Sequence, residues 1–340
     1  MHERQTGIRG HMRNASRHVA AALWRFLFLF VLAAGVVSPA LAFPTKIVTL
    51  VVPFPPGGVV DIVGRLLADK LGTQLGAKVI VENRPGAGGT LGAAFVARAE
   101  PDGYTLLVGG AATHVFSPLI FPDVPYDPVK SFAPVIQLTS GPLVLVVPQN
   151  SPVTTFPEFE NFVRREGERL NYASNGPGTF PHLAAELYRQ ATGAKFTHIP
   201  YSGGPKAILA TVTNEVGFSI NHIPNILGMV KAGKLRAIAS TGRKRSQSFP
   251  DLPTFAESGL AGFETSAWFA IYAPAGTPKT VIEKLNTEAA KALNSRDLRD
   301  KLAVQGDETV GGSPEDLAAY LKAELAKWPA VIKAANVTAK

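Results

Sequence analysis

The sequence predicts an α/β fold with largely parallel sheets. Runs of β-branched and other apolar residues, typical of buried strands, alternate along the chain with segments whose apolar residues recur at helical spacing. Glycine-rich turns stand between many of these segments, and 46% of the residues are hydrophobic, which allows a large core. The length suits one large domain or two lobes of about 100–200 residues each.

The individual elements follow from local patterns. Residues 46–52 form a continuous apolar run, as in a buried strand, and apolar residues between 59 and 71 lie at helical spacing. Residues 242–262 are rich in Pro, Gly and Ser, a composition typical of a connection between lobes. Further strands are expected at 78–82, 104–109, 142–148, 170–174, 195–201, 216–220, 235–241 and 268–274, and further helices at 88–99, 156–167, 180–193, 205 onward, 223–233, 278–294, 297–304 and 314–333.

Residues 1–42 are expected to be a signal peptide rather than part of the fold. Arg4, Arg9, Arg13, Arg17 and Arg25 precede a 12-residue apolar run, Phe26–Val37, and the "ALA" motif that ends at Ala42 supplies a cleavage site. The run is short for a membrane span, which takes about 20 residues. An uncleaved membrane anchor is the alternative, and Met12 is an alternative start. Cleavage after Ala42 would leave residues 43–340 as the exported chain.

The charge and cysteine content narrow the possible partners. Five Arg and one Glu of the leader account for +4 of the +8 net charge, so about +4 remains on residues 43–340. The basic residues are scattered apart from 242–248, so no nucleic-acid partner is expected. That short cluster is read as a solvated loop, with a docking patch as the alternative. The absence of cysteine excludes disulfides, thiolate nucleophiles and sulfur-ligated metals.

Four glycine-rich loops precede predicted helices. They contain Gly57-Gly58, "RPGAGGTLG" at 84–92, "SNGPGTFPH" at 174–182 and "PYSGGPKA" at 200–207. A helix N-terminus presents unpaired N–H groups and a partial positive charge, and glycine lets a ligand approach them. Loops at the carboxyl ends of strands from two halves of a chain would meet across a cleft. This pattern favours a small carboxylate held by backbone N–H and hydroxyl groups, with Thr179 as a candidate N-cap.

The sequence gives little support for catalysis or for a cofactor. Residues 84–92 fail the dinucleotide-binding fingerprint because Leu91 stands where its third glycine belongs, and no P-loop is present. No serine lies in a G-x-S-x-G motif. His114 is the best histidine candidate for a pocket. An exported hydrolase or isomerase remains the alternative class, and His114 with Ser117 or Thr113 would be its constellation.

The chain resembles the Bug family of extracytoplasmic solute receptors, the substrate-binding components of tripartite tricarboxylate transporters. The resemblance covers essentially all of residues 43–340. Its motifs, in chain order, are "PFPPGGVVDIVGRLLADKLG", "VENRPGAGGTLGAAFVARAEPDGYTLLVG", "NYASNGPGTFPHLAAELYRQATG", "HIPYSGGPKAILATVTNEV", "AGKLRAIASTGRKRSQSFPDLPTFAESGL" and "WFAIYAPAGTP".

The resemblance implies a two-lobed periplasmic-binding-protein fold without catalysis or an obligatory cofactor. Its two crossovers would fall near Gly141 and Glu264, so that residues 43–141 and 265–340 form lobe 1 and residues 142–264 form lobe 2. The ligand would be a small carboxylate, and the partners would be the membrane subunits of a transporter. A sensor kinase is the alternative partner. A periplasmic monomer is expected.

The resemblance and the glycine-rich loops together predict which residues contact the ligand. The ligand carboxylate would lie against Gly57 and Gly58, and lobe 2 would contribute Gly178 and Thr179. The full set expected to contact the ligand is Phe54, Gly57, Gly58, Val59, Asp61, Thr113, His114, Gly178, Thr179, Phe180, Tyr201, Ser202 and Asn221.

Three departures from the family pattern suggest a pocket that is less polar than usual. Val59 and Val60 stand where small or hydroxyl residues are common, and Phe180 follows Thr179 where Ser or Thr is common. Asn221 stands where many members carry Asp. The hypothesis is an aromatic or longer aliphatic carboxylate ligand rather than citrate or an amino acid. The alternative is that both valines are ordinary core residues of their helix.

Overall fold

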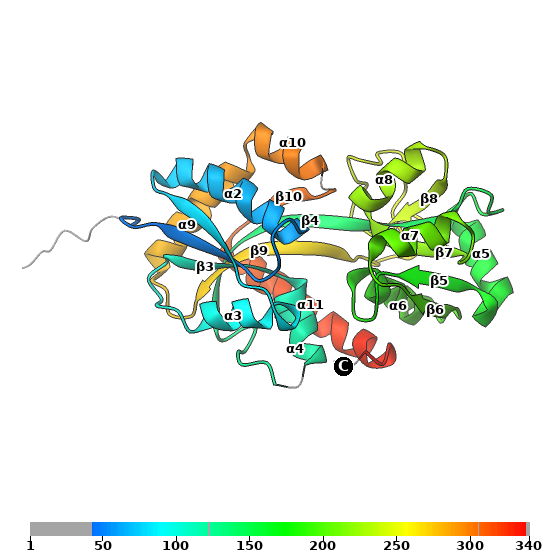
Figure 1. The fold of residues 1–340 in the computed structure, drawn as a ribbon, viewed down its shortest axis with the longest axis horizontal. Helices are drawn as coiled ribbons and strands as arrows, with labels where there is room; N and C mark the ends of the chain where they lie inside the picture. Colours follow the sequence, from blue (N-terminus) through cyan, green and yellow to red (C-terminus); the bar gives the residue numbers. More distant parts are fainter. Residues whose placement is uncertain (1–42, 122, 305, 338–340) are drawn as a thin grey trace, which may run out of the picture. The chain divides into compact units, whose positions relative to one another are not determined.

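Two lobes share one mixed β-sheet, which passes from one lobe into the other (Figure 1). The structure is a computed structural model that describes residues 43–121, 123–304 and 306–337. The predicted signal peptide and its cleavage site therefore lie outside the described residues. No described helix is long and apolar enough to cross a membrane.

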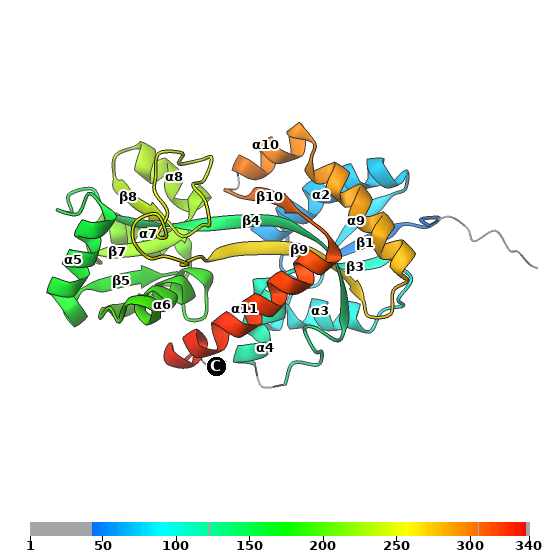
Figure 2. The ribbon, with the colours of Figure 1, turned by 180° about the vertical axis from the view of Figure 1, so that it is seen from behind.

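Lobe 1 is built around parallel strands that are joined by helices. β1 is flanked by β2 and β3, both parallel to it, and β9 pairs antiparallel with β3. The helices lie on both sides of these strands in Figures 1 and 2. The elements are β1 (Val48–Val52), α2 (Val59–Leu75), β2 (Val79–Asn83), α3 (Thr90–Ala97), β3 (Thr105–Gly110), β9 (Ser266–Pro274), α9 (Lys279–Leu293), α10 (Arg296–Val304), β10 (Glu308–Gly311) and α11 (Pro314–Ala334).

Lobe 2 repeats the alternation of strands and helices. β5 lies between β6 and β7 and is parallel to both. Its aromatic core includes Tyr172, Tyr188 and Phe218, each of them fully buried. The elements are α5 (Phe156–Glu166), β5 (Asn171–Ser174), α6 (Phe180–Thr192), β6 (Thr197–Pro200), α7 (Gly204–Val212), β7 (Phe218–His222), α8 (Ile223–Lys231) and β8 (Leu235–Ser240).

A single long strand, β4 (Phe132–Pro148), belongs to both lobes. Its residues 132–142 pair with β9, whereas residues 143–148 pair with β7 and β8, all antiparallel. The sequence predicted only the second part of this strand. The expectation of largely parallel sheets is therefore wrong for the centre of the sheet, where β4 and β9 run antiparallel to their neighbours, and right for the strands linked by α2, α6 and α7.

The ends of several helices follow from residues at their first and last turns. α5 begins with a capping box between Thr155 and Glu158, and α11 begins with one between Ser313 and Asp316. α2 ends at Gly76, whose φ of 64° is the left-handed conformation that glycine adopts most readily. These local signals explain why the predicted helices were placed within a few residues of the observed ones.

Helix α11 starts in lobe 1 and runs toward lobe 2 (Figure 2). Its C-terminal end lies beside α4 (Ser117–Ile120) of lobe 1 and α6 of lobe 2. Leu317 and Leu321 of its first turns are buried in the core of lobe 1. Trp328, further along, is fully buried and contacts Phe180 of lobe 2 with ring centroids 5.8 Å apart. This helix therefore packs against both lobes.

Candidate functional site

A cavity of about 590 Å³ lies between the two lobes. Lobe 1 supplies the residues after β1 and β3 and the start of β9, and lobe 2 supplies the loop before α6. This volume is within the range of small-molecule sites. The lining residues are Phe54, Gly88, Ala111, Ala112, Phe116, Ser117, Ile120, Phe121, Asn175, Pro177, Gly178, Thr179, Phe180, Pro181, His222, Ala267, Trp268, Phe269 and Val337.

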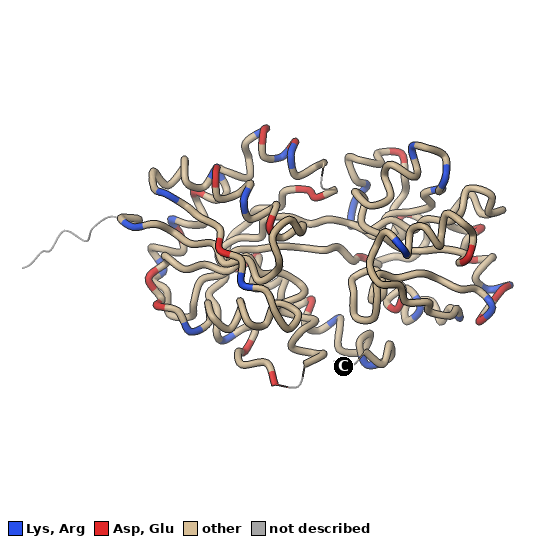
Figure 3. Tube along the Cα trace, in the orientation of Figure 1, with Lys and Arg blue, Asp and Glu red and all other residues tan. Residues whose placement is uncertain are grey.

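None of these described lining residues carries a formal charge at neutral pH. Charged residues of both signs are instead scattered over the two lobes (Figure 3). The polar side chains of the lining are Ser117, Asn175, Thr179 and His222. Burial lowers the pKa of His222 to about 4, so its imidazole is neutral at pH 7. An anion in this cavity would have to be held by backbone N–H groups, neutral side chains and helix dipoles.

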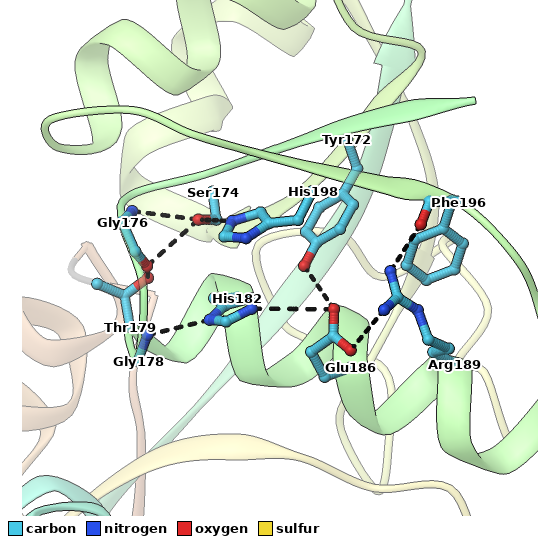
Figure 4. A network of polar contacts seen from close by, with 10 residues as sticks. All are labelled: Tyr172, Ser174, Gly176, Gly178, Thr179, His182, Glu186, Arg189, Phe196 and His198. Carbon is cyan, nitrogen blue, oxygen red and sulfur yellow. Dashed lines mark hydrogen bonds and ion pairs between the residues drawn. The ribbon is translucent and has the colours of Figure 1, made fainter. Parts of the chain in front are cut away.

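The loop before α6 is held by hydrogen bonds of its own (Figure 4). The Thr179 hydroxyl donates to the Gly176 carbonyl at 2.6 Å, and the Gly178 N–H donates to His182 Nδ1 at 3.0 Å. Gly178 has a φ of 74°, which glycine tolerates at little cost. Thr179 occupies the N-cap position, as predicted, but its hydroxyl does not cap the helix. The first-turn N–H groups of α6 are therefore left without a side-chain cap.

A buried polar network between β5, β6 and α6 supports this loop on the side away from the cavity lining. The rings of His182 and His198 stack 4.1 Å apart, and His198 Nε2 lies 2.6 Å from the Ser174 hydroxyl (Figure 4). Glu186 accepts a hydrogen bond from the Tyr172 hydroxyl at 2.8 Å and pairs with Arg189 at 3.1 Å. The stacked rings and the ion pair therefore fix the position of α6, and with it the loop.

The first predicted glycine pair lies outside the cavity lining. Gly57 and Gly58 are exposed at the start of α2, and the Gly57 N–H donates to Asp61 at 2.9 Å. Burial acts to raise the pKa of Asp61, but hydrogen bonds from Arg65, Gly57 and Asn83 outweigh it and lower the pKa to about 2. Asp61 is thus a saturated carboxylate that closes the turn, as expected for a first-turn helix charge.

Neither valine after this glycine pair is a core residue. Val59 is 41% exposed and Val60 is half-buried, and neither is among the residues that line the cavity. The alternative reading of Val59 and Val60 as core residues is therefore not supported. Phe54, just upstream, does line the cavity.

Thr113 and His114 lie behind the cavity wall. Both are fully buried, the Thr113 hydroxyl lies 2.9 Å from His114 Nδ1, and the His114 ring stacks on Tyr272 at 3.9 Å. Ser117 does line the cavity, and its hydroxyl donates to the Gly88 carbonyl at 2.9 Å. His114 therefore contacts Thr113 but does not line the cavity, whereas Ser117 does. Within the described residues, no group of three or more His, Cys, Asp or Glu could hold a metal ion.

The remaining predicted contacts lie in the β6–α7 connection and near the end of β7. Tyr201 is half-buried and donates to Glu215 at 2.8 Å, and Ser202 is exposed. Asn221 is fully buried, and neither its amide nitrogen nor its oxygen has a hydrogen-bond partner. The structure brings Phe54, Gly178, Thr179 and Phe180 together in the cavity lining; the other predicted contacts are not among the lining residues.

Sequence reasoning missed several lining residues. Asn175 lines the cavity with a buried carbonyl oxygen that has no partner, and its position just after a strand was the available signal. Trp268 and Phe269 begin an expected strand, and Trp268 is fully buried although it also forms part of the wall. Val337 had no local signal because it reaches the cavity only through the packing of α11.

The buried histidines make the fold sensitive to acid. Burial lowers the pKa of His114 and His182 to about 3, and that of His198 and His222 to about 4. The unfolded chain takes up these protons near pH 6.5 but the folded chain does not, so the free energy of unfolding falls as the pH drops from about 6.5 toward 4. Burial raises the pKa of Asp307 to about 7, which has the opposite effect in this range.

Because four histidines oppose one aspartate, we expect a net loss of stability, at up to about 1.4 kcal/mol per pH unit for each histidine. Urea unfolding between pH 7 and 5 measures it. A free energy of unfolding that stays constant or rises on acidification would contradict the neutral, buried state of these rings.

Comparisons with known proteins give a consistent result. The model of the tripartite tricarboxylate transporter family receptor matches residues 63–337. The chain is 37% identical over 292 residues to a UPF0065 protein in the tcbD-tcbE intergenic region of Pseudomonas sp. strain P51, with 86% of this chain and 87% of that protein covered. It is 33% identical over 308 residues to protein BugT of Bordetella pertussis, with 90% and 94% covered.

Two solved structures share both sequence and fold with the chain. R. palustris Rpa4515, solved with adipate, is 36% identical with a TM-score of 0.72 and covers 87% of this chain and 99% of its own. MatC (Rpa3494) from Rhodopseudomonas palustris, solved with bound malate, is 35% identical with a TM-score of 0.68 and covers 85% and 100%.

Proposed function

The chain belongs to the Bug family of tripartite tricarboxylate transporter receptors, and on that premise we propose that it captures an aromatic or longer aliphatic carboxylate in the cavity between its lobes. Receptors of this family are periplasmic solute-binding proteins, and a small carboxylate is the ligand class that the family and its solved relatives support. Our proposal narrows this ligand class to an aromatic or longer aliphatic acid.

The observation that carries this proposal is a cavity without charged side chains next to the uncapped N-terminus of α6. Backbone N–H groups and the partial positive charge of a helix N-terminus favour a carboxylate. The first-turn N–H groups of α6 would hold it there beside Gly178 and Thr179, whose own N–H groups already donate to His182 and to the Gly176 carbonyl. Closure of the lobes over the ligand would exclude water and strengthen such hydrogen bonds.

The rest of the lining supports the ligand's proposed apolar body. Five phenylalanines and one tryptophan line the cavity: Phe54, Phe116, Phe121, Phe180, Phe269 and Trp268. A solved relative that was crystallised with adipate has a ligand of this kind. Citrate, which carries several charged groups, would leave some of them against apolar walls at a cost in desolvation.

The remaining parts of the proposal follow from the family. Gly57 and Gly58 would form the opposing contact when the lobes close over the ligand, and closure would be favoured only by the ligand's greater affinity for the closed state. Lobe 1 would comprise residues 43–141 and 265–340, and lobe 2 residues 142–264. The closed receptor would dock onto the membrane subunits of its transporter as a monomer, without catalysis, after export and cleavage following Ala42.

Replacing Asn175 by alanine tests whether its amide N–H group donates to the ligand carboxylate, because the unpartnered Oδ1 is an acceptor and cannot bond to a carboxylate. We expect adipate, as the probe, to bind at least about tenfold more weakly, because a hydrogen bond to a charged group contributes about 1.5–3 kcal/mol. Isothermal titration calorimetry measures the change. Asn150→Ala, at an exposed asparagine outside the cavity lining, is the control. Equal affinities for the two variants would remove Asn175 from the proposed site.

A single substitution in α2 tests the proposed role of the glycine pair. Gly58 has an ordinary φ of −77°, and a Cβ built on it would come no closer than 3.6 Å to the Pro55 carbonyl, so Gly58→Val is expected to fold. We expect it to weaken adipate binding, because the side chain would stand in front of the first-turn N–H groups of α2. An unchanged affinity, with an unchanged melting temperature, would exclude Gly58 from the ligand contacts.

A further inference from the structure

The residue that follows the turn at the end of α11 forms part of the cavity wall. Val337 follows α11, is half-buried and is one of the residues that line the cavity. A Cβ built on Gly178 would lie 3.1 Å from Val337 Cγ1 and 3.4 Å from Ile120 Cδ1. Val337 and Ile120, both carried by lobe 1, therefore contact the loop of lobe 2 to which the ligand's carboxylate is assigned.

The turn at the end of α11 fixes where Val337 lies. Asn336 has a φ of 50°, a left-handed conformation that asparagine adopts more readily than most residues. The Val337 N–H then donates to the Ile332 carbonyl at 3.4 Å, which holds the chain against the last turn of the helix. Residue 337 is thus held in a defined backbone position next to the cavity.

Aromatic contacts fix the position of helix α11 beside the cavity. The Trp328 ring packs edge-on against Phe116, 5.0 Å away, and against Phe180, 5.8 Å away, and both of these phenylalanines line the cavity. Glu324 accepts hydrogen bonds from the indole N–H groups of both Trp328 and Trp268, at 2.9 and 3.2 Å. Any ligand in the cavity therefore meets a wall whose position depends on α11.

The opposite part of the loop is polar. Asn175 lines the cavity close to the start of α7, because a Cβ built on Gly204 would lie 3.4 Å from Asn175 Nδ2. The loop thus presents an amide near α7 and, at Gly178, an apolar contact with Val337 and Ile120. A ligand whose carboxylate faces Asn175 would have its apolar part beside Val337.

We propose that Val337 is a specificity-determining residue that sets the size of the ligand by closing one side of the cavity next to Gly178. The proposal rests on the proposed function, because it assumes that a carboxylate occupies this cavity. A smaller side chain at position 337 would make room for a longer acid, and a larger one would exclude it. A difference of about one methylene in an apolar pocket changes affinity by roughly tenfold or more.

The test compares the binding of succinate, adipate and suberate, a series of increasing chain length, by isothermal titration calorimetry. The protein is first unfolded and then refolded, so that any ligand bound during expression is removed. The variants are Val337→Ala and Val337→Phe. The matched control is Val304→Ala, because Val304 is 71% exposed on α10 and lies outside the cavity lining. Melting temperatures of all variants are measured without ligand, so that a loss of folding is recognised.

We expect Val337→Ala to raise the affinity for suberate relative to adipate by about tenfold, and Val337→Phe to shift the preference toward succinate. The control should keep the wild-type ratios. If Val337→Ala keeps those ratios too, whether or not its melting temperature changes, the residue is merely structural and the inference is overturned while the proposed function stands. If the wild-type protein binds none of the three acids, the aliphatic part of the proposed ligand class is wrong and the inference falls with it.

Discussion

Replacement of Glu324 by alanine is expected to lower the free energy of unfolding by about 3–5 kcal/mol. Glu324 is 2% exposed, and one of its oxygens accepts the indole N–H groups of Trp268 and Trp328. Its other oxygen pairs with Lys327. The substitution would leave two buried N–H donors without a partner and the Lys327 ammonium without its carboxylate, which costs more than the original interactions contribute.

Urea unfolding followed by circular dichroism measures this loss. Glu283→Ala is the matched control, since Glu283 is exposed and pairs with the exposed Lys279 at 3.6 Å; exposed pairs of this kind contribute about 0–1 kcal/mol. The same buried carboxylate holds Trp268 in the cavity wall, so weaker ligand binding should accompany the loss of stability. Similar stabilities for Glu324→Ala and Glu283→Ala would show that the tryptophans do not depend on the carboxylate.

A negative charge at position 179 is expected to weaken carboxylate binding at least about 100-fold. Thr179 is half-buried in the loop before α6 and lines the cavity. Two like charges about 4 Å apart near a protein surface repel each other by roughly 4 kcal/mol. In Thr179→Glu the new carboxylate would also take the place at the positive N-terminus of α6 that the ligand carboxylate occupies in the wild-type protein.

Thr179→Gln separates charge from shape, because glutamine has nearly the same size and both variants lose the hydrogen bond to the Gly176 carbonyl. Titration with adipate should show a moderate loss for Thr179→Gln and a much larger one for Thr179→Glu. The gap should narrow as the salt concentration rises, since salt screens partly exposed charges. Equal losses for the two variants would place the carboxylate away from this helix.

Most of the fold could be predicted from local patterns because its helices and inner strands have strong apolar periodicity. The first part of β4 was missed because Pro134, Gln137 and Ser140 interrupt its apolar pattern, while pairing with β9 stabilises it. The short strand β10 has little apolar character and depends on β4 for its hydrogen bonds. The Bug-family assignment and the two-lobed fold are confirmed by the family match and the solved relatives.

The candidate site was predictable only where glycine marks a helix start. Gly178 and Thr179 were found in this way, and Phe180 followed from its place beside them. Residues such as Trp268 and Val337 reach the cavity through contacts between segments far apart in the chain, which no local pattern reports. The basic residues at 243–245 behave like an ordinary surface loop, because each pairs with a glutamate: Glu264, Glu308 and Glu257 in turn.

The most direct test of the central claim is a thermal-shift titration of residues 43–340, unfolded and refolded to remove bound ligand. The panel contains adipate, suberate, aromatic acids, citrate, malate and aspartate. A ligand at about 100 times its dissociation constant adds roughly 2.7 kcal/mol to the free energy of unfolding, enough to raise the melting temperature measurably. We expect such a rise with longer aliphatic or aromatic acids. Tight binding of citrate or aspartate, with no response to the apolar acids, would contradict it.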